Sequence, residues 1–158
     1  MADFRALDDK IQRNLQTSLG DLSRLCAQPS IAARNIGMME CAELTAELLR
    51  GRGFEVQVMP TKGSPVVYAE RKGRVDRTLL FYNHYDVQPP EPLELWDSPP
   101  FEPTLRDGKM FARGVSDDKG HILCRLAAID AHSLIASLGS DYHLINQEVS
   151  AVSELVVF

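Results

Sequence analysis

The segment Leu79–Asp86, with the sequence LLFYNHYD, decides the fold and carries the first cluster of reactive side chains. Its first four residues form a short apolar run, which predicts a buried strand. The run ends at Asn83, so His84 and Asp86 follow it two residues apart. Side chains at this spacing in an extended chain point to the same side. An imidazole and a carboxylate are therefore predicted to lie together at the tip of a strand.

A second cluster, Arg113–Gly120, with the sequence RGVSDDKG, lies where a loop is expected to turn into a helix. The adjacent acids Asp117 and Asp118 repel each other unless a cation lies against one of them. Gly114 and Gly120 allow backbone conformations that other residues resist, and they allow a ligand to approach closely. The two clusters together predict part of a metal site.

Simpler interpretations of these residues stay open. His84 and Asp86 could form a structural hydrogen-bonded pair, because an imidazole N–H commonly pairs with a carboxylate. Asp117 or Asp118 could cap the N-terminus of the following helix. A cap alone does not account for two adjacent acids between Arg-Gly and Lys-Gly. A phosphate loop is a poor alternative, because the glycine spacing differs from a P-loop and two acids repel phosphate.

The periodicity of apolar residues elsewhere predicts an α/β domain. Steps of three and four residues are typical of helices, and alternation is typical of half-buried strands. Helices are expected over residues 3–27, 37–50 and from 117 onward, and strands over 54–59, 65–70 and 78–82. Asp107-Gly108 indicates a hairpin turn. This order of elements predicts a mixed sheet flanked by helices.

The segment from Pro89 to Pro103 is rich in proline, which excludes a helix or a central strand. It also contains Trp96 and Phe101. Flexible linkers rarely contain large aromatic residues among their prolines. We therefore predict an ordered loop that lies on the surface of the domain.

Composition excludes several classes of protein. The chain has 158 residues and a formal net charge of −5, and it contains no run of basic residues, so we expect no nucleic-acid partner. Arg71–Arg74 is its nearest approach to a basic cluster and is predicted to be a solvated turn. No secretory signal or membrane-length apolar run is present, so we expect no membrane partner. Cys26, Cys41 and Cys124 lack CxxC spacing, which predicts buried free thiols and a cytoplasmic location.

Four segments in the same order resemble the M20 family of co-catalytic zinc metallopeptidases, and specifically its carnosine-dipeptidase branch. They are Asn83–Pro89 (NHYDVQP), Trp96–Pro103 (WDSPPFEP), Asp107-Gly108 and Ala112–Gly120 (ARGVSDDKG). The resemblance implies a truncated zinc-peptidase-like catalytic domain. It divides the chain into residues 1–131, the N-terminal part of that domain, and residues 132–158, a divergent C-terminal tail.

The resemblance also implies a role for each matching residue. His84 corresponds to a ligand of one metal ion, and Asp86 to the acid that orients this histidine and is counted among the catalytic residues. Asp117 corresponds to the carboxylate that bridges two metal ions, and the Asp117–Asp118 peptide bond is expected to be cis. Three further residues are expected to hold this loop without binding metal, namely Arg113, Asp118 and Lys119.

The activity implied is hydrolysis of dipeptides or of the amide bond of N-acyl amino acids, by water activated between two zinc ions. Manganese or cobalt are alternative metals. The family supplies its general base from an adjacent Glu-Glu pair, and this chain contains no such pair. Glu148 and Glu154 are isolated, and either one as the base is a minor hypothesis. His132 and His143 are interpreted as ordinary histidines rather than ligands.

The truncated chain is therefore predicted to be inactive by itself. Its last residues, Leu155–Phe158, are apolar, as expected of a truncation within a core strand or of an alternative exon. The alternative function is a non-catalytic truncated or splice-variant product that acts only by association, or has no activity. A homodimer is expected only for a full-length form that has a lid domain.

Overall fold

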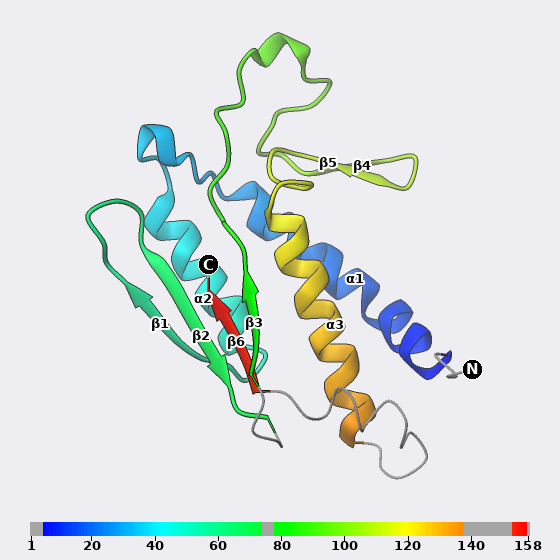
Figure 1. The fold of residues 1–158 in the computed structure, drawn as a ribbon. Helices are drawn as coiled ribbons and strands as arrows, with labels where there is room; N and C mark the ends of the chain where they lie inside the picture. The colour runs from blue at the N-terminus through cyan, green and yellow to red at the C-terminus, as the bar shows by residue number, and fades with distance from the viewer. Residues whose placement is uncertain (1–4, 74–77, 138–152, 158) are drawn as a thin grey trace.

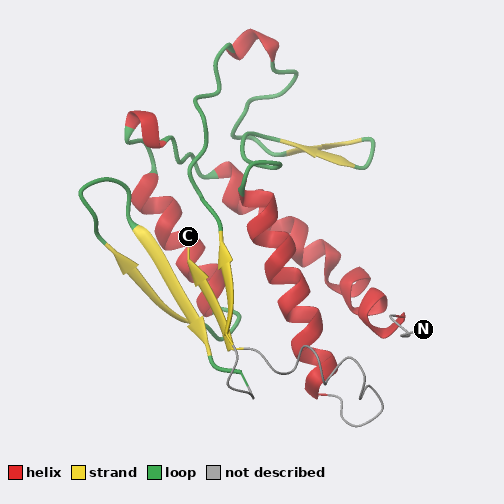
Figure 2. Ribbon diagram, viewed as in Figure 1, coloured by secondary structure: helices red, strands yellow, loops and turns green. Residues whose placement is uncertain are grey.

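The computed structural model describes residues 5–73, 78–137 and 153–157, which form helices on one side of a small sheet (Figures 1 and 2). The helices are α1 (Arg5–Ala27), α2 (Met38–Arg50) and α3 (Lys119–Ser137). The strands are β1 (Glu55–Met59), β2 (Val66–Arg71), β3 (Thr78–Tyr82), β4 (Thr104–Arg106), β5 (Lys109–Phe111) and β6 (Ser153–Val157). Single turns of 3-10 helix lie at Ala32–Arg34 and Leu93–Leu95.

The main sheet is mixed, as predicted, and its strands lie in the order β1-β2-β6-β3. β1 pairs antiparallel with β2, and β2 pairs antiparallel with β6. β6 and β3 run parallel, and the last pair in their register is Tyr82 with Val157. The carboxyl ends of these two parallel strands therefore lie at the same edge of the sheet.

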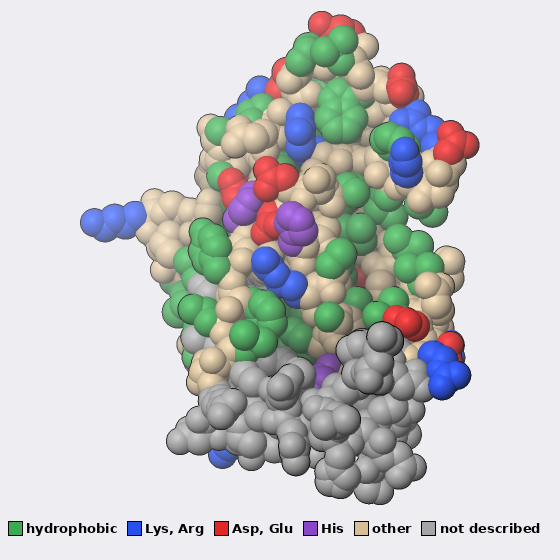
Figure 3. Space-filling model, turned by 45° about the vertical axis from the view of Figure 1, so that its right-hand side comes forward, with side chains coloured by type: hydrophobic (Ala, Val, Ile, Leu, Met, Phe, Trp, Pro, Cys, Tyr) green, Lys and Arg blue, Asp and Glu red, His purple; other side chains and the backbone are tan. Residues whose placement is uncertain are grey.

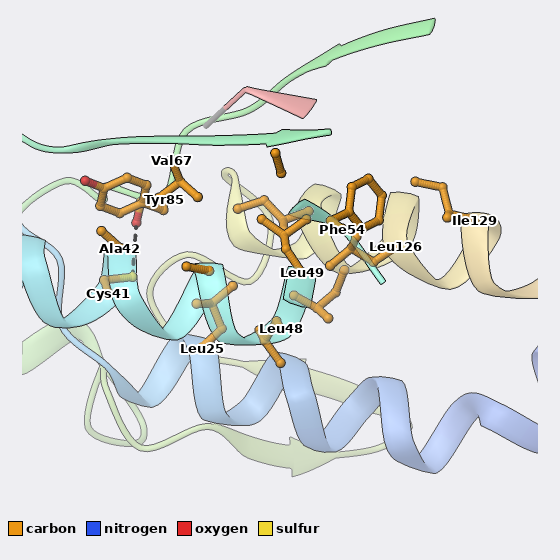
Figure 4. Close-up of a cluster of buried hydrophobic side chains, with 14 of the residues drawn as sticks. Leu25, Cys41, Ala42, Leu48, Leu49, Phe54, Val67, Tyr85, Leu126 and Ile129 are labelled. Carbon is orange, nitrogen blue, oxygen red and sulfur yellow. Dashed lines mark hydrogen bonds between the residues drawn. The ribbon is translucent and has the colours of Figure 1, made fainter. Parts of the chain in front are cut away.

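The core lies between this sheet and helices α2 and α3, and α1 packs against the far side of both helices (Figure 4). It is built from side chains of every layer, among them Leu25 from α1, Leu49 from α2, Val67 from β2 and Leu126 from α3. Each is at most 1% exposed. Burying a side chain of this size stabilises the fold by about 1.5–3 kcal/mol, so these contacts hold the layers together.

Backbone positions that require glycine separate the elements. Gly37, just before α2, has a φ of +66°, and a Cβ there would lie 2.0 Å from the Pro29 carbonyl oxygen. The predicted hairpin turn is confirmed, because Asp107 and Gly108 have φ values of 50° and 72° between β4 and β5. Positive φ at both central residues is the conformation of a type I′ turn.

Arg52, which follows α2, ties the three helices together. Its Nε donates to Asp130 Oδ2 on α3 at 2.9 Å, and its Nη2 donates to Asp21 Oδ2 on α1 at 2.8 Å. Its Nη1 donates to the Leu48 carbonyl oxygen at 3.0 Å. The Arg52 side chain is only 11% exposed, so these ion pairs are largely shielded from solvent.

The proline-rich segment is an ordered loop, as predicted. Trp96 Nε1 donates to the Pro90 carbonyl oxygen at 2.8 Å, within the loop itself. Glu91 accepts two hydrogen bonds of 2.8 Å from the Arg34 guanidinium, which tie the loop to the segment between α1 and α2. These contacts and its aromatic residue hold the loop in one conformation without a helix or a sheet.

The prediction that Leu79–Tyr82 is a buried strand is half right. The residues form β3, but Leu79, Leu80 and Tyr82 are 41%, 60% and 72% exposed. Only Phe81 packs against the core. The physical reason is the alternation of side chains along a strand: Leu80 and Tyr82 point to the sheet face opposite to that of Phe81, and the described helices lie on one side of the sheet (Figure 1). Apolar composition alone does not reveal which face is covered.

The prediction of three buried thiols is confirmed for Cys26 and Cys41 and wrong for Cys124. Cys124 lies on the face of α3 that lines an apolar groove against α1, so its sulfur reaches solvent. Burial raises the pKa of Cys26 to about 11, and it also raises the pKa of Cys41. The two buried thiols are thus protonated near neutral pH, and a protonated thiol is a poor nucleophile.

We therefore predict that a disulfide reagent such as DTNB modifies one thiol per native chain rapidly at pH 8, and all three only after unfolding in urea. The fast reaction should disappear in Cys124→Ser and persist in Cys41→Ser. Rapid modification of all three thiols in the native chain would contradict the burial of Cys26 and Cys41. Absorbance of the released thiolate measures each phase.

Candidate metal centre

The candidate site lies just beyond the carboxyl end of β3, where His84 stands between two aspartates. His84 Nδ1 lies 3.1 Å from Asp86 Oδ1, and His84 Nε2 lies 3.0 Å from Asp117 Oδ1. The His84 side chain is 42% exposed and that of Asp117 is 79% exposed. The structure thus brings together the three residues that the sequence singled out, although Asp117 is 33 positions further along the chain.

A neutral imidazole has too few N–H protons for this arrangement. A neutral ring has one N–H and one acceptor nitrogen, whereas here both nitrogens face an ionisable carboxylate. Either the ring is a doubly protonated imidazolium or a cation lies between Nε2 and Asp117. Asp86 at Nδ1 leaves Nε2 as the nitrogen with a free lone pair, which is how a carboxylate prepares a histidine for a metal ion.

Electrostatics agrees with a cation at this position. Burial lowers the pKa of His84, but the Asp86 carbonyl and the neighbouring aspartates outweigh burial and raise the pKa above its ordinary value of 6.5. Without a metal ion, the proton takes the position of the cation. With a metal ion bound at Nε2, that proton must leave.

The loop that presents Asp117 is tightly packed at two glycines. Gly114 has a φ of +90°, and a Cβ there would lie 3.0 Å from both the Lys119 Cδ and the Val87 Cγ1. A Cβ on Gly120 would lie 1.9 Å from the Val115 carbonyl oxygen. The predicted cis peptide bond is present between Asp117 and the residue after it.

Asp118, unlike Asp117, points into the protein. The residue is 8% exposed, and its Oδ2 accepts hydrogen bonds from Asn83 Nδ2 at 2.7 Å and from the His84 backbone N–H at 3.1 Å. Its Oδ1 is paired with His121 Nδ1. Burial raises the pKa of Asp118, but these hydrogen bonds lower it further, so the carboxylate stays ionised. Asp118 therefore ties the loop to β3 rather than capping α3 with its side chain.

Lys119 fastens the loop from the other side. Its side chain is fully buried, and Nζ donates to the carbonyl oxygens of Leu25 at 2.8 Å and Gln28 at 2.7 Å. These acceptors lie at the C-terminal end of α1, where a cation interacts favourably with the helix dipole. Burial lowers the pKa of Lys119. The two hydrogen bonds hold the start of α3 against the end of α1.

Arg113 connects the same loop to the proline-rich segment. Its backbone N–H donates to the Pro100 carbonyl oxygen at 2.7 Å, and its Nη2 donates to the Pro89 carbonyl oxygen at 3.2 Å. The guanidinium lies 5.1 Å from the centre of the Trp96 ring. Arg113, Asp118 and Lys119 all contact the framework around the loop, and their role in holding it without binding metal stays a prediction.

The donors present suit a divalent metal ion. One ligand atom each from His84, Asp117 and Asp118 lie within 4.8 Å of one another. An imidazole nitrogen with carboxylate oxygens is a donor set found for zinc and neighbouring transition metals. Since both Asp118 oxygens are occupied by protein donors, His84 and Asp117 are the two residues with ligand atoms to offer. Figure 3 shows the face on which histidine and acidic side chains gather.

Three residues of this region were missed by the sequence analysis, namely Asn83, His121 and Arg125. A signal for two of them was available. Asp118, His121 and Arg125 are spaced three and four residues apart, which places them on one face of the start of α3. Asn83 belongs to the Asn83–Pro89 segment that resembles the M20 family, but no role was predicted for it from the sequence.

The remaining candidate residues lie elsewhere along the chain. His132 lies in α3 and is partly buried. Glu154 belongs to β6, where its backbone pairs with Leu79 and Arg71. His143 and Glu148 lie outside the described residues. A glutamate base stays a prediction.

Comparison with known proteins identifies the family. Residues 80–145 match peptidase family M20/M25/M40. A succinyl-diaminopimelate desuccinylase of Bordetella avium is 37% identical over 111 residues, which cover 70% of this chain and 28% of that protein. An M20 family metallo-carboxypeptidase of Sulfolobus solfataricus is 35% identical, with a TM-score of 0.75 over 89% of this chain and 30% of the other.

Human carnosine dipeptidase 1 shares the fold, with a TM-score of 0.78 over 98% of this chain and 34% of that structure, at 21% identity. The fold and the histidine–aspartate cluster define the chain as part of an α/β metallopeptidase-type domain. More narrowly, the chain belongs to the M20 peptidase family. It spans between 28% and 34% of the length of these three proteins.

Two finer predictions are not decided by these comparisons. The family match reaches residue 145, and the division of the chain at residue 131 stays a prediction. The carnosine-dipeptidase branch also stays a prediction, because the similar proteins include a desuccinylase and a carboxypeptidase as well as a dipeptidase. Among the described residues, no helix is both long and apolar enough to cross a membrane.

We predict that the His84 ring titrates above 6.5 in the metal-free chain and that Asp86→Asn lowers its midpoint. The imidazolium is the form that the fold favours, so its stabilisation is complete below the ordinary pKa and is lost as pH rises through the raised pKa. Histidine ring signals in NMR spectra across pH 5–9 measure the midpoint. Asp97→Asn, at an exposed carboxylate, is the control, and a wild-type midpoint below 6.5 would contradict the prediction.

Proposed function

We propose that His84 and Asp117 bind zinc as part of an M20-type site that hydrolyses the amide bond of a small peptide or an N-acyl amino acid. The observation that carries the proposal is the His84 ring, held at Nδ1 by Asp86 and facing Asp117 at 3.0 Å through Nε2. Membership of a peptidase family supports a peptide-like substrate. Manganese and cobalt suit the same donors.

The residues of the chain would divide the work as follows. Asp86 fixes the orientation of the His84 ring and makes its Nε2 a better donor. Asp117, whose side chain is 79% exposed and meets only His84 through Oδ1 among the contacts described, would be suited to bridge two ions. Bound zinc would lower the pKa of a coordinated water molecule and polarise the amide carbonyl group. Asp118 and Lys119, through their hydrogen bonds to Asn83 and to the end of α1, would keep Asp117 in place.

An adjacent glutamate pair is the part of this mechanism that the sequence lacks. A glutamate usually takes the proton from a metal-bound water in such reactions. Glu148 and Glu154 remain isolated candidates. Catalytic zinc is held by three protein ligands and structural zinc by four, whereas His84 and Asp117 are the two proposed ligands among the described residues. We therefore propose that the chain alone binds zinc weakly and has negligible turnover.

Calorimetric titration of the purified chain with zinc tests this proposal. We expect a dissociation constant above the micromolar range. His84→Ala should raise this dissociation constant by at least tenfold, because the imidazole is the stronger of the two ligands. His132→Gln is the matched control and should bind as the wild type does. Equal binding by His84→Ala would refute the site, and sub-micromolar binding together with peptidase activity would refute the proposed inactivity.

A second candidate function is association without catalysis. The observation that favours it is the apolar exposure of β3, where Leu80 is 60% and Tyr82 is 72% exposed. Exposed edge strands with apolar side chains are templates for pairing with another chain. On this proposal, the chain acts by binding another polypeptide along β3, with or without metal.

Size-exclusion chromatography with light scattering distinguishes the two candidates. If β3 drives association, the chain should elute as oligomers whose fraction rises with concentration, and Leu80→Ser with Tyr82→Ser should shift it to monomer. Leu105→Ser, at a leucine that is also 60% exposed but lies on the separate hairpin, is the matched control. A monodisperse monomer at high concentration would argue against association.

The other expectations about partners stay proposals of the same kind. A homodimer is proposed only for a full-length form with its lid domain. A cytoplasmic location rests on the free thiols, which suit a reducing compartment. The expectation of no nucleic-acid partner rests on the acidic balance of the sequence, and the expectation of no membrane partner rests on the lack of a membrane-length apolar run.

A further inference from the structure

Arg125 in α3 contacts the end of β3 through three successive residues. Its Nη1 donates to the Tyr82 carbonyl oxygen at 2.8 Å and to Asn83 Oδ1. Its guanidinium also lies 5.9 Å from the centre of the Phe81 ring. These contacts place a cation next to the strand end from which His84 projects, although Arg125 contacts neither His84 nor Asp117 in any of them.

Asn83 transmits this contact toward the site. The residue is 2% exposed, so its amide must find partners inside the protein. Its Oδ1 accepts from Arg125, and its Nδ2 donates to Asp118 Oδ2 at 2.7 Å. The two ends of one amide therefore link a helix cation to the carboxylate beside Asp117.

His121 completes the set at the other oxygen of the same carboxylate. His121 Nδ1 is paired with Asp118 Oδ1, one helical turn after it. Asp118 is thus held at both oxygens by the chain of contacts from Arg125 through Asn83 and by His121. Hydrogen-bond partners on both oxygens leave this carboxylate one orientation.

We propose that Arg125 is a positioning residue for the metal centre, acting through Asn83 and Asp118 on the orientation of Asp117. The inference rests on the proposed function, since it concerns the same site. Asp117 is 79% exposed and contacts His84 by its side chain, so its direction depends on the backbone that it shares with Asp118. That backbone is fixed where the Asp118 carboxylate is fixed.

The contacts of Arg125 differ in what they require of the cation. Both hydrogen bonds, to the Tyr82 carbonyl and to the Asn83 amide, come from Nη1, while the planar guanidinium lies near the Phe81 ring. A lysine ammonium has donors for the two hydrogen bonds but lacks the planar group that lies near the ring. Without Arg125, the Asn83 amide could rotate and leave Asp118 with one fewer fixed partner.

The decisive experiment is a double-mutant cycle on zinc affinity, measured by calorimetry with the full chain. We expect Arg125→Ala to weaken zinc binding roughly tenfold, at the lower end of what supporting residues of metal ligands contribute. Arg125→Lys should recover part of this loss. In the Asn83→Ala background, Arg125→Ala should change the affinity less than twofold, because the two residues act in series.

Arg52→Ala is the matched control for a loss of stability. It removes an arginine whose side chain is 11% exposed and that also joins α3 to other elements, but that has no contact with the site. Arg52→Ala should lower the unfolding midpoint in urea and leave zinc affinity within twofold. Equal losses of affinity in the two variants, or additive effects of Arg125→Ala and Asn83→Ala, would overturn the proposal.

A metal-free measurement separates this inference from the proposed function. The backbone amide signals of Asp117 and Asp118 in the NMR spectrum should shift in Arg125→Ala and stay in place in Arg52→Ala. In the Asn83→Ala background, Arg125→Ala should cause no further shift. If these amides do not respond to Arg125, the positioning role is wrong whether or not zinc binds. If they respond but zinc does not bind, the proposed function alone fails.

Discussion

The histidine held between two carboxylates is the constraint on which the rest of the site depends. His84 has one proton to share when neutral, and Asp86 and Asp117 both approach its ring nitrogens. Such a ring is stable only if it carries a second proton or faces a metal ion. The raised pKa of His84 is the signature of this demand in the metal-free chain. The contacts of Asp118 and Lys119 fasten the loop that presents Asp117 to His84.

Two adjacent aspartates take opposite roles because their surroundings differ. Asp118 is 8% exposed and surrounded by donors, which lower its pKa and fix both of its oxygens. Asp117 is open to solvent and keeps its oxygens available. Lys119, the next residue, is fully buried and bonds the end of α1. The repulsion between the two carboxylates is therefore offset at Asp118 by protein donors. At Asp117 it is offset by a cation, either the His84 imidazolium or a metal ion.

Periodicity and turn chemistry predicted most of the fold, because they reflect local backbone preferences. α2 and the β4–β5 hairpin are where glycine positions and apolar spacing placed them. The exposure of Leu80 on β3 could not be predicted, since it depends on which face of the sheet the helices cover. His84, Asp86 and Asp117 were found because their residue types are chemically distinctive. Asn83 was missed because nothing in the sequence shows that a buried amide spans two elements.

The topology explains why these residues meet at all. In sheets with helices alongside, ligands bind beyond the carboxyl ends of parallel strands. β3 and β6 form the parallel pair of the main sheet, and β3 ends at Tyr82, directly before the residues of the site. α3 begins at the same edge and brings Asp117 and Asp118 with it. The segments of the site are thus separated by the proline-rich loop in sequence but joined by the geometry of one sheet edge and one helix start. A helix that begins there also presents Arg125, two turns further on, to the strand end that carries His84.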